Sequence, residues 1–174
     1  MQKKYFITVY TEDQIGLLNR ITNVFTRRQM NIESLTASKS EIKEVHKFTI
    51  LVYDTEERVQ KVISQLEKQI EVIRAFYHEH SDTIFQEVAL YKIALEKADQ
   101  QEKSIESIVR QSHASIISVN KDFIVIEKTG HFKETEELLQ ELQPFGVLQF
   151  IRSGCVAITK TPMHVSKQLK EFNH

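Results

Sequence analysis

The chain has 174 residues, of which 41% are hydrophobic and 27% charged, a composition typical of a globular protein and not of a disordered or membrane protein. This length suits one ordinary domain or two small ones. The 23 Lys and Arg residues and 24 Asp and Glu residues leave a formal net charge of −1, which provides no electrostatic basis for binding nucleic acid or an anionic membrane.

The N-terminus has the pattern of neither a secretory signal nor a membrane span. Its basic pair, Lys3 and Lys4, leads directly into a short strand-like run that charges interrupt. The chain is therefore expected to stay in the cytoplasm. The one cysteine, Cys155, has no possible disulfide partner within the chain and is expected to be a small buried hydrophobic residue.

The first half of the chain predicts the order strand, helix, strand, strand, helix, strand. Apolar and β-branched residues at 4–10 indicate a strand that is buried on both faces. Ile15, Leu18 and Phe25 then recur at helical spacing, which predicts an amphipathic helix over residues 14–29. The remaining elements follow from the same periodicities: strands at 31–40 and 45–54, a helix at 56–70 and a strand at 72–78.

The second half repeats this order after a polar joint at residues 78–83. Its elements are a strand at 87–95, a helix at 99–113, a hairpin of strands at 114–120 and 122–128, a helix at 132–143, a strand at 147–153 and a further strand at 155–160. Residues 164–174 fit either a short amphipathic helix or a frayed tail.

Two βαββαβ units predict the α+β class with two ferredoxin-like domains, residues 1–80 and 81–174. In each unit, two helices cover one face of an antiparallel sheet. The open face and the free edges that this plan leaves commonly attract a second sheet or chain.

Gly16 stands near the start of the first predicted helix, where glycine costs roughly 0.5 to 1 kcal/mol relative to alanine. If Asp13 caps this helix, the unpaired amides of the opening turn form a place for an anion such as a carboxylate, and Gly16 lets a ligand approach the backbone. Alternatively, Gly16 lets the loop pack tightly against its own sheet. Asn31, at the start of the next strand, either provides turn chemistry or binds the polar end of a ligand.

The sequence contains no Walker loop, no dinucleotide-binding glycine motif, no nucleophile elbow and no cysteine array. His78 and His80 would share one face of a strand, but no third metal ligand stands at a fixed spacing. We therefore expect no catalytic residues and no metal site. A binding or regulatory role is favoured.

The segment DQIGLLNRI, followed by MNIESL, resembles the ACT domain, a ferredoxin-like module that commonly binds amino acids. The longer stretch GLLNRITNVFTRRQMNIESL resembles the opening of the small regulatory subunits of acetolactate synthase. EVALYKI, ASIISVN and FIRSGCVAITK are similar, in the same order, to the C-terminal domain of those subunits.

The resemblance implies a non-catalytic subunit that forms a homodimer through its ACT domains. A branched-chain amino acid, usually valine, would bind between those domains as the effector. The chain would associate with a large catalytic subunit of acetolactate synthase in the biosynthesis of valine, leucine and isoleucine, raise its activity and make it sensitive to feedback inhibition. Thiamine diphosphate would belong to that partner, and this chain would need no cofactor.

Carried over by position, the implied effector site consists of Asp13, Ile15, Gly16, Leu17 and Leu18 of one chain and Asn31 and Ile32 of its neighbour. Two positions depart from the family pattern. Gln29 stands where many relatives have glycine, so the turn there must either accept a strained residue or take another form. Asp13 stands where some relatives have asparagine, and its charge would either weaken carboxylate binding or pair with the effector's ammonium group.

Two other functions remain as alternatives. The chain could be a free-standing tandem ACT-type sensor that controls a transcription factor or another enzyme. It could also be a small enzyme on a ferredoxin-like fold, but an acylphosphatase-like site needs an arginine in its phosphate loop, and residues 11–16 (TEDQIG) contain none.

Overall fold

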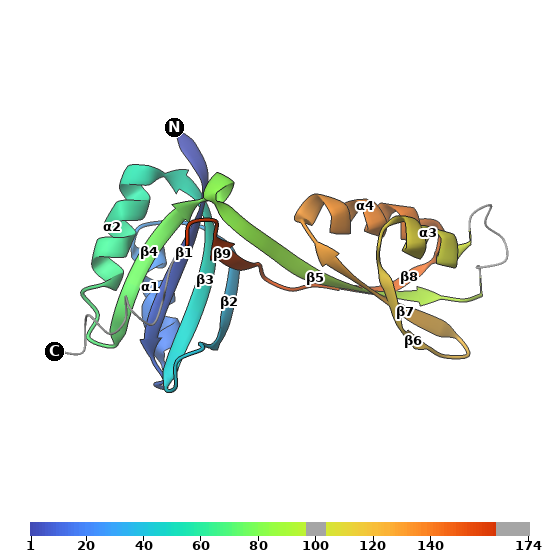
Figure 1. Cartoon of the computed structure of the whole chain (residues 1–174), viewed down its shortest axis with the longest axis horizontal. Helices are drawn as coiled ribbons and strands as arrows, with labels where there is room; N and C mark the ends of the chain where they lie inside the picture. The colour runs from blue at the N-terminus through green and yellow to red at the C-terminus, as the bar shows by residue number, and fades with distance from the viewer. Residues whose placement is uncertain (97–103, 163–174) are drawn as a thin grey trace. The chain divides into compact units, whose positions relative to one another are not determined.

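The computed structural model describes residues 1–96 and 104–162 and divides the chain into two compact units (Figure 1). The first unit is Met1–Phe85 together with the described residues from Cys155 onward, and the second is Gln86–Gly154. The predicted α+β class and the repeated βαββαβ order are confirmed. The division differs from the predicted one because the last strand, which the sequence assigned to the second half, belongs to the first unit.

The first unit contains one antiparallel sheet, with strand order β2-β3-β1-β4. Its elements are β1 (Gln2–Glu12), α1 (Leu17–Arg27), β2 (Ile32–Lys39), β3 (Val45–Thr55), α2 (Glu56–Leu66) and β4 (Val72–Glu79). A short 3-10 turn, η1 (His80–Asp82), leads into β5 (Thr83–Ala94), which begins in this unit and continues into the second.

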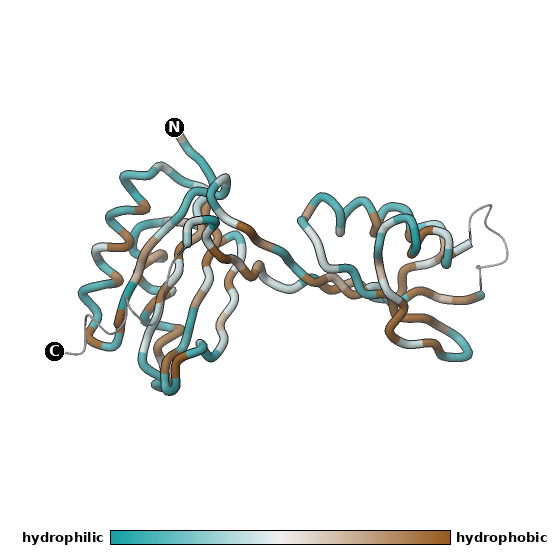
Figure 2. The backbone as a smooth tube through the Cα atoms, in the orientation of Figure 1, coloured by the Kyte–Doolittle hydropathy of each residue, from teal (hydrophilic) through white to brown (hydrophobic). Residues whose placement is uncertain are grey.

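Helices α1 and α2 cover one face of the first sheet. Because successive strand residues point to opposite faces, Tyr5, Ile7 and Val9 of β1 enter this core together. They pack there with Ile21 of α1 and Val59 of α2. Figure 2 shows hydrophobic and hydrophilic stretches alternating along α2, as expected for a helix with only one buried side.

The last described strand, β9 (Val156–Thr159), pairs with β5 and packs on the opposite face of the first sheet. Phe6 and Leu51 of the sheet form a second buried cluster there with Cys155 and Ala157. This explains why β1 is buried on both faces, as its apolar run predicted. Cys155 is 7% exposed, so its expected role as a buried hydrophobic residue is confirmed.

The second unit repeats the plan of the first, with strand order β6-β7-β5-β8. Its remaining elements are α3 (Ile105–Gln111), β6 (Ser115–Val119), β7 (Phe123–Gly130), α4 (Phe132–Leu142), the 3-10 turn η3 (Gln143–Phe145) and β8 (Val147–Arg152). Tyr91, Ile108, Ile126 and Leu138 are among its core residues. Residues 99–103 of the predicted third helix and the predicted element at 164–174 lie outside the described residues.

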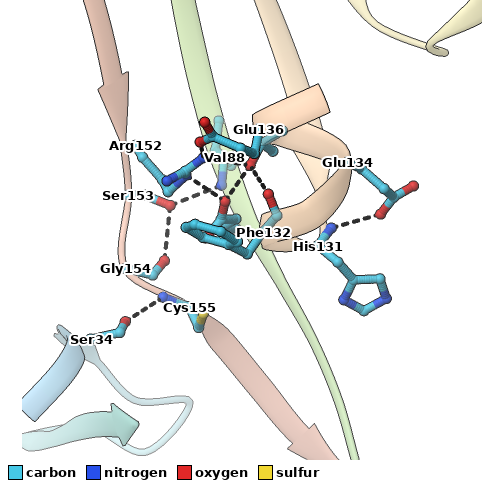
Figure 3. A network of polar contacts seen from close by, with 12 residues as sticks. Ser34, Val88, His131, Phe132, Glu134, Glu136, Arg152, Ser153, Gly154 and Cys155 are labelled. Carbon is cyan, nitrogen blue, oxygen red and sulfur yellow. Dashed lines mark hydrogen bonds and ion pairs between the residues drawn. The ribbon is translucent and has the colours of Figure 1, made fainter. Parts of the chain in front are cut away.

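A polar cluster centred on Arg152 ties β8 to β5 and α4 in the second unit. The Arg152 Nε atom lies 2.7 Å from a carboxylate oxygen of Glu87, and its Nη2 atom lies 3.1 Å from Glu136. Figure 3 shows Arg152 beside Glu136 and Phe132, and the guanidinium carbon lies 4.3 Å from the Phe132 ring centroid. Glu87 is only 5% exposed, so its charge depends on Arg152 for compensation.

Helix α1 ends in a Schellman motif with a glutamine in the position that favours glycine. Gln29 has a φ angle of 51°, and its N–H donates to the carbonyl of Thr26. The N–H of Met30 donates to the carbonyl of Phe25, and both of these side chains are buried in the core. The turn therefore accepts a strained non-glycine residue, which is the first of the two forms anticipated for Gln29. His113 repeats this arrangement after α3, with a φ angle of 54°.

Gln29→Gly is expected to stabilise the first unit by about 0.5 to 1 kcal/mol. A non-glycine residue in the left-handed region costs roughly 1–2 kcal/mol, and the substitution removes this strain. The greater conformational freedom of glycine in the unfolded chain offsets only part of that stabilisation. Thermal unfolding followed by circular dichroism should show a higher midpoint. Asn23→Gly, at an exposed position inside α1, should instead lower the midpoint. A lower midpoint for Gln29→Gly would contradict this account of the turn.

Candidate functional site

The sequence-predicted site residues fall at the two ends of α1. Gly16 is the N-cap residue of this helix, with φ 86° and ψ −3°, and no side chain caps the helix start. The N–H of Arg20 donates to the carbonyl of Gly16 as the first helical hydrogen bond. The amides of Leu17, Leu18 and Asn19 therefore have no intrahelical acceptor, and they carry the positive end of the helix dipole.

The predicted start of this helix was wrong. Residues 14–16 are not helical, and Asp13 is not the cap, because the chain enters α1 through the left-handed conformation of Gly16. The tight-packing interpretation of Gly16 is also wrong. A Cβ atom added there would meet no heavy atom within 4 Å, so backbone conformation, not space, favours glycine at this position.

Asp13 lies just before this turn and contacts β3. Its N–H donates to the carbonyl of Glu44, and its carboxylate lies 3.5 Å from the Nε2 atom of His46. Sequence reasoning missed His46, which stands 33 positions further along the chain. The pairing of β1 with β3 brings the two residues together, because it places Glu12 opposite Val45, next to His46. Only a prediction of this strand register would have identified His46.

The three apolar residues at the turn have different environments. The side chain of Leu17 is 3% exposed and belongs to the interior, so only its amide is available to a ligand. Ile15 is 103% exposed and Leu18 is 47% exposed. Two apolar side chains thus stand in water beside the unpaired amides.

Asn31 and Ile32 lie beyond the other end of α1. Asn31 is exposed, whereas Ile32 is partly buried against the core. Helix α1 has 11 residues, and at 1.5 Å per residue it is roughly 16 Å long. A single amino acid is much smaller than this separation. The structure brings Asp13, Ile15, Gly16, Leu17 and Leu18 together in one chain, but does not bring Asn31 and Ile32 to them.

Within residues 1–96 and 104–162, no three His, Cys, Asp or Glu side chains are grouped so that they could hold a metal ion. His78 and His80 lie near aromatic rings, Phe76 for His78 and Phe85 for His80. No helix in the described part of the chain has both the length and the apolar character needed to cross a membrane.

Comparison with known proteins identifies relatives of both halves of the chain. Residues 86–161 match the family model of the small subunit of acetolactate synthase, and residues 7–74 match that of the ACT domain of acetohydroxyacid synthase small subunits. The acetolactate synthase small subunit of Bacillus subtilis is 33% identical over 158 residues, covering 90% of this chain and 91% of the relative. That of Mycobacterium leprae is 35% identical over 156 residues, with coverage of 90% and 91%.

A solved structure supports the fold. The crystal structure of the acetolactate synthase small subunit from Thermotoga maritima superposes with a TM-score of 0.83, covering 92% of this chain and 99% of that one. The two sequences are 23% identical, so this likeness concerns the fold alone.

Proposed function

Because the chain belongs to the family of acetolactate synthase small subunits, we propose that it regulates a large catalytic subunit in response to a branched-chain amino acid. Membership in this family implies a non-catalytic role in branched-chain amino acid biosynthesis and a catalytic large-subunit partner. The finer proposal is that the chain raises the activity of its partner and makes it sensitive to feedback inhibition, with valine as the expected effector. In this proposal thiamine diphosphate belongs to the partner.

The main support for the proposed effector site is the structure of the start of α1. The α-carboxylate of an amino acid carries a full negative charge, and helix N-termini attract such anions through both their unpaired N–H groups and their dipole. The amides of Leu17 and Leu18 have no intrahelical acceptor. The exposed side chains of Ile15 and Leu18 stand beside them. A carboxylate with a branched apolar side chain matches both features.

The ammonium group of the effector needs an acceptor of its own. Asp13 offers a carboxylate that is 46% exposed and lies 3.5 Å from His46. We propose that Asp13 turns toward the ammonium group when the effector binds. The negative charge of Asp13 then favours a zwitterionic amino acid over a simple carboxylate.

A second copy of the chain would complete the site. Asn31 and Ile32 lie at the far end of α1, so within one chain they are too distant to touch an effector held at Gly16. A homodimer through the ACT domains, with the edge of one sheet beside the other, would supply these two residues from the neighbour. The amide of Asn31 would hold the polar end of the effector, and Ile32 would limit the room for its side chain.

Feedback then requires two arrangements of the dimer with different affinities for the effector. A ligand can shift an equilibrium only by its differential affinity for the two states. An effector held between two chains meets this condition, because any change in the relative positions of the two chains alters the contacts of the effector. The arrangement that binds valine tightly would be the one that lowers the activity of the catalytic subunit.

Co-elution tests the partnership. The chain, mixed with the acetolactate synthase large subunit of its own organism, should elute from a sizing column as one complex at an earlier volume than either protein alone. Separate elution at micromolar concentrations would contradict the proposal and favour the free-standing sensor. The match to the small-subunit family along residues 86–161 is the observation that favours the partnership over that alternative.

A further inference from the structure

Within the described residues, the segment 155–162 covers part of the face of the first sheet that lies opposite its helices. Two hydrogen bonds hold Cys155 there. Its N–H donates to Ser34 Oγ at a distance of 2.8 Å, and its carbonyl accepts from Thr36 Oγ1 at a distance of 3.0 Å. The contact with Ser34 is visible in Figure 3. Further along, the N–H of Lys160 donates to the carbonyl of Asp82. The segment 155–162 is thus held at both ends.

A cavity of about 470 Å³ lies between this segment and the uncovered part of the sheet. Its size is in the range of small-molecule sites, roughly 300–1,000 Å³, and far exceeds the roughly 30 Å³ of one water molecule. Both walls carry apolar groups, contributed by Tyr10, Phe76 and His78 of the sheet and by Ala157, Ile158 and Pro162 of the covering segment.

His78 is part of the aromatic wall of the cavity. Its Nε2 atom is buried and has no hydrogen-bond partner among the described residues. Burial lowers the pKa of the imidazole, against an opposing effect of the Asp82 charge, so the ring is neutral at pH 7. Because the Nε2 atom is buried, His78 contributes a neutral ring to the wall and not a polar contact.

The charges at the cavity favour an anion. Lys47 is partly buried, its Nζ atom lies 6.0 Å from the centroid of the Tyr10 ring, and no carboxylate of the described residues lies within 4.0 Å of it. Lys160 adds a second ammonium group, which donates to the carbonyl of Ser81. The one carboxylate of the lining, Glu41, is exposed and therefore better screened by water than Lys47.

Tyr10 is a further hydrogen-bond donor. Burial, together with the nearby charge of Glu41, raises the pKa of its phenol to about 12, so the hydroxyl keeps its proton at neutral pH. The cavity thus combines aromatic walls with a partly buried cation and a phenol.

We propose that this cavity binds a small monocarboxylate with an aromatic or branched apolar body. The carboxylate lies at Lys47, and the apolar body rests against the rings of Tyr10 and Phe76. This site is separate in sequence from the effector site at Gly16 and does not depend on it.

Three probes that share one phenyl ring test the proposal on the full chain: phenylacetate, 2-phenylethanol and phenethylammonium. Binding is followed by the imidazole resonances of the isotopically labelled protein, with His78 assigned from a His78→Gln variant. Phenylacetate should shift the His78 resonance saturably and bind more tightly than the other two probes. No saturable shift, or tighter binding of phenethylammonium, would overturn the proposal.

Lys47→Met keeps most of the apolar stem of the side chain and removes its charge. It should weaken phenylacetate binding about fivefold, the upper range for a partly solvated ion pair, and leave 2-phenylethanol binding unchanged. Lys61→Met, the same change on the exposed face of α2, should alter neither. If Lys47→Met weakens the binding of phenylacetate and of 2-phenylethanol equally, the proposal that Lys47 holds an anionic group is contradicted. The Gly16→Asp variant should bind phenylacetate as the wild type does. The cavity and the effector site at Gly16 are therefore tested independently of each other.

Discussion

Gly16→Asp is expected to abolish saturable binding of valine to the chain. The new carboxylate would occupy the place that the proposed effector carboxylate takes at the start of α1. Two like charges at about 4 Å repel by about 4 kcal/mol at an effective dielectric constant of about 20, which is roughly a thousandfold in affinity. Isothermal titration with valine, leucine and isoleucine, with lysine as a negative control, measures the loss.

Gly16→Asn is the matched control for this substitution. Asparagine and aspartate both tolerate the left-handed conformation of this position, where φ is 86°, and a Cβ atom there has open space around it. Both variants should therefore fold. The asparagine variant should retain measurable valine binding, because it adds bulk without charge. Wild-type affinity in Gly16→Asp, or equal losses in both variants, would contradict a carboxylate site at these amides.

Arg152→Met is expected to destabilise the second unit by about 3–5 kcal/mol, the usual cost of leaving a buried charge without its partner. Glu87 would keep a carboxylate that is 5% exposed while losing the guanidinium group 2.7 Å away. Hydrogen exchange measured by mass spectrometry should show faster exchange in peptides of β5, β7 and β8. Peptides of α1 and α2, in the first unit, should exchange at nearly the wild-type rate.

The double variant Glu87→Gln, Arg152→Met separates charge from packing. The amide of glutamine can still accept a hydrogen bond from the Thr135 hydroxyl, which lies 2.5 Å from the Glu87 carboxylate. Most of the lost stability should therefore return. If the double variant is as unstable as Arg152→Met, the role of Arg152 lies in its contact with Phe132 and not in its charge.

Periodic patterns predicted every described α-helix and β-strand, because the alternation of apolar residues in strands and the apolar stripe of amphipathic helices are local properties. They did not predict the 3-10 turns η1 and η3, and they began β5 at residue 87, whereas the strand begins at Thr83. The start of α1 was misplaced for a reason that is also local. Ile15 continues the apolar stripe of the helix in sequence, and Asp13 is a good cap residue. In the structure Ile15 is fully exposed, and the helix begins only after the left-handed turn at Gly16.

The position of the last strand could not be predicted. The apolar alternation of residues 155–160 indicates a strand, but not the sheet face that it covers. That face is determined by long-range contacts, such as those of Cys155 with Ser34 and Thr36. The cavity behind this segment was invisible for the same reason, because its walls come from strands far apart in the chain.

The proposed effector site was only partly accessible from the sequence. The resemblance supplied the residues, but the sequence placed the helix start before Gly16 and not after it. The partner of Asp13 depends on strand pairing, which brings His46 beside it. The helix bounds place the two groups of site residues at opposite ends of α1, which agrees with the assignment of Asn31 and Ile32 to a neighbouring chain that the resemblance implied.

We propose that this chain gives a catalytic subunit its response to a branched-chain amino acid. The most direct test is the rate of acetolactate formation by the large subunit, with and without the chain, as valine is increased. We expect the chain to raise the rate and valine then to lower it saturably, while the large subunit alone is slower and insensitive to valine. A rate that the chain leaves unchanged, or equal sensitivity to valine without it, would contradict the account.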